Sequence, residues 1–193
     1  IDSPVTGSAN SLADLSSLIK KLNNNSVKTL FIIGANPVYS APASLGFVEA
    51  TKNVDTIVHV GLYADDTSVI ANWHVPQTHF LEAWTDGLAY DGTVAIGQPL
   101  IDPLYTGKSV HDLFGLLNGS TQTAYEIIRK KWMDEKGEAG FEKFWRTALH
   151  EGVVANSAPK GSNPAVKEAA LNKPMLKAEG GDLEICLRPD PTV

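Results

Sequence analysis

Residues 29–37, TLFIIGANP, constrain the fold of this chain more than any other stretch. Four large apolar residues in a row, Leu30 to Ile33, predict a strand buried on both faces, as in a central parallel strand beneath helices. The strand stops at Gly34, and Asn36 and Pro37 follow in the loop. Open α/β sheets bind ligands at the carboxyl ends of their strands, so this turn is where a site is expected. The simpler interpretation is that Asn36 and Pro37 only shape the turn.

Helix and strand patterns alternate through the first half of the chain. The predicted helices cover residues 8–25, 43–52 and 68–72, the last capped by Asp66 or Thr67, and the further strands cover residues 55–62 and 73–76. Such alternation is typical of parallel βαβ units with right-handed crossovers. The predicted fold class is therefore α/β, a doubly wound, mostly parallel sheet with helices on both faces.

The second half predicts fewer strands and more helices. A polar and aromatic loop is expected at residues 77–87, a turn at 90–93, an extended segment at 94–101, and helices at 109–117, 124–136 and 141–150. We divide the chain into an α/β domain (1–120), a helical appendage of that domain (121–152), and an extended linker leading into a β element (153–193). Within the linker a short helix is expected near residues 165–171 and a strand at 181–187.

Composition excludes several classes of function. The formal net charge is −6 and no cluster of lysine and arginine stands out, which argues against a nucleic-acid surface. The longest apolar runs fall short of the roughly 20 residues that a membrane-spanning helix needs, so direct membrane insertion is not expected. The single cysteine, Cys186, excludes an internal disulfide and an iron–sulfur cluster held by this chain alone. We expect its thiol to be unreactive, in a half-buried strand.

The two ends suggest a piece of a longer protein. The chain begins at Ile1 without methionine and closes on the proline-rich residues 188–193, RPDPTV. The lack of a signal peptide therefore says nothing about export of the parent protein.

Common catalytic fingerprints do not occur. The sequence has no G-x-G-x-x-G, G-x-x-x-x-G-K-[ST] or G-x-S-x-G motif. His74, His79 and Glu82 lie close together in sequence, but their spacing fits neither one helical face nor one side of a strand. Hydrogen-bonded histidines are the favoured interpretation over zinc. His59 is expected to be a satisfied core histidine, and His111 and His150 are expected to be solvated or capping.

Acidic and aromatic residues also have structural interpretations. The adjacent Asp65 and Asp66 precede a predicted helix, where a cap and its dipole partner are favoured over acid–base chemistry. Asp86 and Asp91 are likewise placed at loop ends. The four tryptophans are expected to anchor cores and interfaces, although a tryptophan can also stack on a ligand ring.

The order of three motifs resembles a known family. GANP at residues 34–37 is followed by DDTSVIA at 65–71, and then by VP at 75–76 with FLE at 80–82. This order resembles the third domain of the molybdopterin oxidoreductases of the dimethyl sulfoxide reductase family. There an α/β domain helps to hold a molybdopterin guanine dinucleotide at its strand ends. The resemblance implies cofactor-binding positions at Gly34, Asn36, Asp65, Thr67 and Gln98, with no catalytic or metal-binding residue in this chain.

Departures from that pattern indicate one branch of the family. The arginine of the usual E-G-R-x-Q segment is missing after residue 82. Segments such as WHVP (73–76), YDGT (90–93) and QPLI (98–101) resemble the large molybdopterin-like iron–sulfur subunit of alternative complex III, a quinol:cytochrome c oxidoreductase. That resemblance implies a molybdopterin-enzyme fold without the cofactor, with iron–sulfur clusters elsewhere in the parent.

Three hypotheses follow. The first is a non-catalytic structural domain of a respiratory electron-transfer complex on the periplasmic side of the bacterial inner membrane. Its partners would be other domains of the parent subunit and other subunits of that membrane-bound complex. The second is a domain that binds molybdopterin guanine dinucleotide in an active molybdenum oxidoreductase. The third is an unrelated module of flavodoxin-like shape that binds a small ligand.

Overall fold

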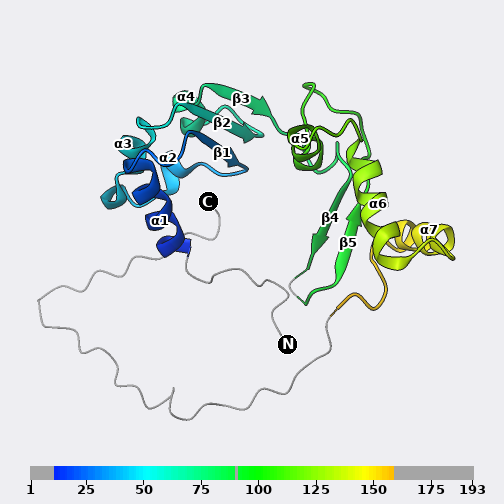
Figure 1. The fold of residues 1–193 in the computed structure, drawn as a ribbon. Helices are drawn as coiled ribbons and strands as arrows, with labels where there is room; N and C mark the ends of the chain where they lie inside the picture. The colour runs from blue at the N-terminus through cyan, green and yellow to red at the C-terminus, as the bar shows by residue number, and fades with distance from the viewer. Residues whose placement is uncertain (1–10, 90, 159–193) are drawn as a thin grey trace, which may run out of the picture. The chain divides into compact units, whose positions relative to one another are not determined.

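Three parallel strands form the first sheet of the chain (Figure 1). They are β1 (Thr29–Ile33), β2 (Thr56–Gly61) and β3 (Trp73–Pro76), hydrogen-bonded in the order β1-β2-β3. The structure, a computed structural model, describes residues 11–89 and 91–158. The parallel pairing confirms the predicted α/β class, and all three strands lie where the sequence pattern predicts them.

Helices precede and connect these strands. Helix α1 (Ser11–Asn23) leads into β1, and α4 (Asp66–Ile70) connects β2 to β3. Between β1 and β2 the chain forms α2 (Pro37–Ser40), the 3₁₀ helix η1 (Ala43–Leu45) and α3 (Phe47–Thr51). The prediction of one helix over residues 43–52 was wrong, because Gly46 adopts a left-handed φ of 65° that separates η1 from α3. The start predicted for α1, before residue 11, lies outside the described residues.

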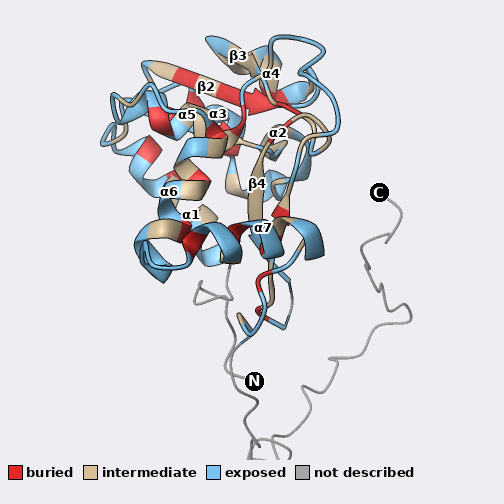
Figure 2. Ribbon diagram, turned by 90° about the vertical axis from the view of Figure 1, so that its right-hand side faces the viewer, coloured by how far each residue is buried: buried red, intermediate tan, exposed pale blue. Residues whose placement is uncertain are grey.

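Strand β2 is the most deeply buried of the three. The side chains of Ile57, His59 and Val60 are 5%, 1% and 0% exposed, and Figure 2 shows this strand largely in the colour of buried residues. One cluster of apolar side chains joins the sheet to its helices: Ile19 and Leu22 of α1, Leu30 and Ile32 of β1, Phe47 and Ala50 of α3, and Ile57 of β2. This cluster fixes the strands against α1 and α3.

Strand β1 is less buried than its sequence predicts. Leu30 and Ile32 are buried, but the alternate residues Thr29 and Phe31 are exposed, with Phe31 at 39%. Among the described strands β1 lies at the edge of the sheet and β2 at its centre. The expectation of a central strand buried on both faces was therefore wrong for β1, because an apolar run does not reveal the strand order.

The second half of the described chain has its own sheet and core. Strands β4 (Thr85–Leu88) and β5 (Val94–Gly97) pair antiparallel, and α5 (Val110–Leu117), α6 (Ala124–Lys136) and α7 (Phe141–Glu151) follow. The predicted bounds of all three helices agree with the structure to within one residue. Residues 85–87 were expected in a loop, and β4 was missed because TDGL carries only one apolar residue.

The core of this half is aromatic. Trp132 and Ile128 of α6 pack with Phe141 and Trp145 of α7 and with Ile96 of β5. The rings of Phe141 and Trp145 stack with centroids 5.9 Å apart. The expectation that tryptophans anchor cores is confirmed for Trp132 and Trp145, whereas Trp73 is 67% exposed.

Helix capping explains where α5 and α6 begin. Ser109 and Asp112 form a capping box at α5, and Thr123 and Glu126 form another at α6. In each box a hydroxyl oxygen accepts from the third helical N–H, and the acidic side chain accepts from the cap residue's N–H. The predicted cap at Ser109 is confirmed.

Several predictions lie outside the described residues. They are the short helix near 165–171, the strand at 181–187, and the environment of Cys186. The division at residues 120 and 152 also stays a prediction. Within residues 11–89 and 91–158, no helix is both long enough and apolar enough to cross a membrane.

The core of the first sheet predicts a contrast between two leucines of α1. Leu22 is fully buried and Leu12 is 53% exposed. We expect Leu22→Ala to lower the free energy of unfolding by about 2–5 kcal/mol, because it leaves a cavity between α1 and the sheet. Leu12→Ala, the matched control, should change it by less than about 0.5 kcal/mol. Urea unfolding followed by circular dichroism measures both, and equal losses would contradict the packing described.

Candidate functional site

A pocket of about 370 Å³, with polar side chains among its lining residues, lies at the carboxyl ends of the parallel strands. Gly34, Ala35 and Asn36 line it after β1, residues of β2 and the following loop line it at positions 59–65, and Gln77 lines it after β3. Parallel pairing places these ends at one edge. Leu30 of β1 pairs with Ile57 of β2, and Gly61 of β2 pairs with Pro76 of β3. This is the edge at which the sequence predicts a site.

Asn36 and Thr67 hold the loops after β1 and β2 together. The hydroxyl of Thr67 donates to Asn36 Oδ1 at 2.7 Å and accepts from the backbone N–H of Val38 at 3.2 Å. Thr67 is fully buried, so it lies beneath the pocket and does not line it. These two predicted cofactor-binding residues therefore contact each other.

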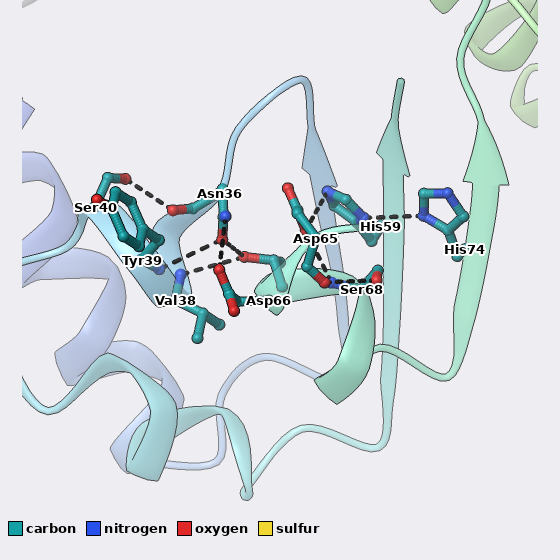
Figure 3. Close-up of polar contacts among 10 residues, drawn as sticks. Asn36, Val38, Tyr39, Ser40, His59, Asp65, Asp66, Ser68 and His74 are labelled. Carbon is teal, nitrogen blue, oxygen red and sulfur yellow. Dashed lines mark hydrogen bonds and ion pairs between the residues drawn. The ribbon is translucent and has the colours of Figure 1, made fainter. Parts of the chain in front are cut away.

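Asn36 uses the rest of its amide within the same loops. Its Oδ1 also accepts from the N–H of Tyr39 at 3.3 Å and so caps α2, and its Nδ2 donates to Asp66 Oδ2 at 3.3 Å. Figure 3 shows these contacts converging on the one side chain. The local sequence explains the cap, because Pro37 at the first helical position leaves the Tyr39 N–H for the asparagine oxygen.

Asp65 caps α4 and faces the pocket. Its Oδ1 accepts from the N–H of Ser68 at 3.1 Å. The predicted cap at Asp66 or Thr67 was wrong by one or two residues, because Asp65 is the residue with extended backbone before the helix. The interpretation of the Asp65–Asp66 pair as a cap with an acidic first turn is confirmed.

His59 is buried in β2 with one ring nitrogen partnered. Its Nδ1 lies 3.0 Å from Nδ1 of His74, its register neighbour on β3 (Figure 3). Its Nε2 has no hydrogen-bond partner among the described residues and lies 3.7 Å from Asp65 Oδ1, beyond hydrogen-bond distance. His59 was expected to be a satisfied core histidine. Its burial agrees with that expectation, but of its two ring nitrogens only Nδ1 has a hydrogen-bond partner among the described residues.

His59, Gly61 and Gln77 line the pocket but were not predicted to lie in the site. One signal for His59 was its position two residues before the end of β2, in a strand parallel to β1. Gly61 is required there, since a Cβ at this position would lie 2.9 Å from His59 Cε1. Gln77 follows β3 directly, and its N–H donates to the carbonyl of Gly61 at 3.0 Å.

The five predicted cofactor-binding residues do not all lie together. Gly34, Asn36 and Asp65 line the pocket, and Thr67 supports it from below. Gln98 does not line it, and its Nε2 donates to the carbonyl of Leu149 at 2.9 Å. Ligand binding by any of them stays a prediction.

The two histidines and the glutamate considered for zinc, His74, His79 and Glu82, have other partners. Glu82 Oε2 accepts from the N–H of His79 at 2.8 Å and its Oε1 from the N–H of Leu104 at 3.1 Å, contacts that lower the pKa of Glu82. His74 pairs with His59. Across the part of the chain that the structure describes, no group of three histidine, cysteine or acidic side chains could hold a metal ion.

A larger groove, of about 490 Å³, runs along α7. Phe144, Ala148 and Val153 line it, and its walls are mainly apolar. Binding sites combine apolar walls with a few convergent polar groups, and those polar groups occur at the strand ends. The strand-end pocket is therefore the candidate site.

Asp86 is the most strongly perturbed carboxylate, and it lies on β4. Its side chain is 10% exposed, with His111 Nε2 of α5 at 3.4 Å and Lys131 Nζ of α6 at 2.5 Å. The hydrogen bond to His111, then the hydrogen bond and charge of Lys131, hold the pKa of Asp86 far below its usual range. His111 was expected to be solvated or capping, and that was wrong. The cluster ties three elements together and stabilises this half of the chain.

Comparisons with known proteins give no family match, and the structural similarity described below is weak. A scan against protein-family models and a search of curated proteins found no match. Among solved structures, the chain is similar to acetylene hydratase from Pelobacter acetylenicus, with a TM-score of 0.44 and 17% sequence identity. The similarity covers 49% of this chain and 14% of that enzyme, so the chain spans a small part of the enzyme's length. At this level the similarity carries no functional argument.

The loop contact predicts the effect of removing the Thr67 hydroxyl. Thr67→Val keeps the side-chain volume but leaves the Val38 N–H and Asn36 Oδ1 without this partner. We expect the free energy of unfolding to fall by about 1–3 kcal/mol and amide exchange at Val38 to accelerate. Thr147→Val, whose exposed hydroxyl bonds only to Lys143 of its own helix, should change stability by less than about 0.5 kcal/mol. Unchanged exchange at Val38 would contradict the contact.

The low pKa of Asp86 predicts a pH-dependent contribution to stability. Between the folded pKa and the ordinary aspartate value of 3.8, the unfolded chain binds a proton that the folded chain does not. Stability therefore rises with pH through this window and is lost as pH falls through it. We expect Asp86→Asn to cost about 1–2 kcal/mol at pH 7 and less at pH 3. Urea unfolding at both pH values measures this.

Asp134→Asn is the matched control for Asp86→Asn. Asp134 forms an exposed pair with Lys130 on α6, and such pairs contribute about 0.5 kcal/mol or less. A cost for Asp86→Asn that is equally small, or that stays constant with pH, would overturn the assignment.

Proposed function

We propose that this chain is a non-catalytic, molybdopterin-oxidoreductase-like structural domain. Its parent would be a subunit of a respiratory quinol:cytochrome c electron-transfer complex on the periplasmic side of the bacterial inner membrane. The domain would contribute packing surface and hold neighbouring domains and subunits in register. The motif order from Gly34 to Glu82, on an α/β fold, is the basis for the family, and the departures after Glu82 are the basis for the branch.

One observation carries the non-catalytic part of the proposal. The side chains of Asn36 and Thr67, at the positions that would approach a cofactor, bond to each other at 2.7 Å and to their own loops. A side chain whose polar atoms are already paired must break those bonds to bind a ligand, which lowers the net gain. The arrangement favours loop structure over cofactor binding.

The residues of the pocket do not fit the phosphates of molybdopterin guanine dinucleotide. A pyrophosphate needs positive charge or converging N–H groups, which arginine, lysine or a helix N-terminus supply. Among the described residues no lysine or arginine lines the strand-end pocket, whereas Asp65 lines it and Asp66 contacts Asn36 at its border. The side chains of Asn36 and Asp65 already accept from N–H groups at the starts of α2 and α4. The local charge is therefore of the wrong sign for a dinucleotide.

The alternative is a domain that binds molybdopterin guanine dinucleotide in an active molybdenum oxidoreductase. Asp65 favours it, because a carboxylate at the pocket wall is a good acceptor for the N–H groups of a guanine ring. The two functions differ in cofactor content, which can be measured directly.

Metal and pterin analysis of the native protein tests the proposal. We expect the parent protein, purified from its own membrane complex, to contain iron but neither molybdenum, tungsten nor pterin above background. Elemental analysis by mass spectrometry and fluorescence of the oxidised pterin give the two readings. Molybdenum or tungsten at about one atom per chain would overturn the non-catalytic assignment. A parent sequence without a ferredoxin-type cysteine region would overturn the respiratory one.

A further inference from the structure

The strand-end pocket contains a buried nitrogen, Nε2 of His59, that lacks a hydrogen-bond partner among the described residues. His59 is 1% exposed and lines the pocket. Leaving a buried polar atom unpaired costs about 1–3 kcal/mol, so a hydrogen-bond partner at this atom would stabilise the protein. The pocket is the space from which that partner would reach it.

The hydrogen bond on the other side of the ring determines what His59 Nε2 can offer. Nδ1 of His59 and Nδ1 of His74 lie 3.0 Å apart, so one of them donates and the other accepts. When the proton lies on His59 Nδ1 and is donated to His74, Nε2 of the neutral His59 ring is an acceptor. A neighbouring group that donates to Nε2 stabilises this tautomer.

The pocket holds further acceptor atoms beside His59 Nε2. Asp65 Oδ1 lies 3.7 Å from His59 Nε2, and Gln77 Oε1 lies close beside Gly34. One of the two N–H groups of the Asn36 amide is used on Asp66. Because none of the described residues in its wall is a lysine or arginine, the pocket attracts a group that is positively charged and rich in N–H donors.

We propose that the strand-end pocket is a socket for the guanidinium group of an arginine side chain from a neighbouring polypeptide segment. A guanidinium is planar, carries five N–H donors in a fixed fork, and stays charged. One of its N–H groups donates to the Asp65 carboxylate and another to His59 Nε2, two acceptors close enough for one fork to reach. Gly34 and Gly61 contribute no side chain to the walls, which leaves room for a flat group at these two positions.

This inference rests on the proposed function, because a socket for a protein side chain requires that no nucleotide fills the pocket. It names the chemistry by which a structural domain would hold its neighbour. A lysine ammonium has the charge but lacks the planar fork, so the socket discriminates between the two cations.

Titration with a blocked arginine tests the socket. N-acetyl-L-arginine methylamide is added to the 193-residue chain while the ring nitrogens of His59 are followed by ¹H–¹⁵N correlation spectroscopy. We expect a saturable shift of His59 Nε2 with a dissociation constant on the order of 1 mM, which is typical of one charged hydrogen-bonded group. N-acetyl-L-lysine methylamide should bind about tenfold more weakly. No shift of His59 with the arginine probe, or equal binding of both probes, overturns the proposal.

Two aspartate variants isolate the charge in the pocket. Asp65→Asn keeps a side-chain oxygen that caps α4, so the fold is preserved, and it should weaken arginine binding about tenfold. Asp55→Asn removes the same charge from an exposed position before β2, paired with Lys28, and should leave binding unchanged. Equal effects of the two variants would show a nonspecific charge attraction and overturn the socket.

Guanosine 5′-diphosphate separates failure of the socket from failure of the proposed function. Saturation of the His59 signal by this nucleotide at micromolar concentration would overturn both. If neither the nucleotide nor the arginine probe shifts the His59 signal, only the socket is overturned.

Discussion

Parallel pairing of β1, β2 and β3 is the constraint on which the strand-end site depends. Because the strands run in one direction, their carboxyl ends and the loops that follow lie at a common edge. Residues separated by about thirty positions in sequence, such as Asn36 and Thr67, become hydrogen-bond partners there. The burial of β2 between its neighbours stabilises this arrangement, since α1 and α3 pack on the same apolar cluster. The packing of the core therefore determines where these loops lie.

The same edge explains why family resemblance and local chemistry lead to different expectations. The motif order places Gly34, Asn36, Asp65 and Thr67 where a cofactor would be held, and the fold brings these four residues to one edge. Yet Thr67 is buried beneath the pocket and Asn36 joins two loops, which are structural roles. These motif residues therefore connect the loops whether or not a ligand is present. The charge around the motif is a separate criterion for ligand binding.

Local pattern predicted those elements whose cause is local. The strands at residues 29–33 and 73–76 and the helices of the second half followed from apolar periodicity and from capping residues such as Ser109. Strand order, the exposure of Phe31 and the contact between His59 and His74 depend on partners that pair across the sheet, which no single stretch of sequence encodes. Likewise, Asp86 and His111 lie on different elements, so only packing brings them together. The pocket could be placed at the right edge from sequence, but its deepest polar atom could not.

The glycine at position 61 has a consequence for how this chain can change over evolution. A methyl group there would meet the His59 ring at 2.9 Å, so even alanine requires the imidazole to move. His59 in turn is fixed by His74 across the sheet. Positions 59, 61 and 74 are therefore coupled through packing. We expect a substitution at one of them to be tolerated only when the other two accommodate it.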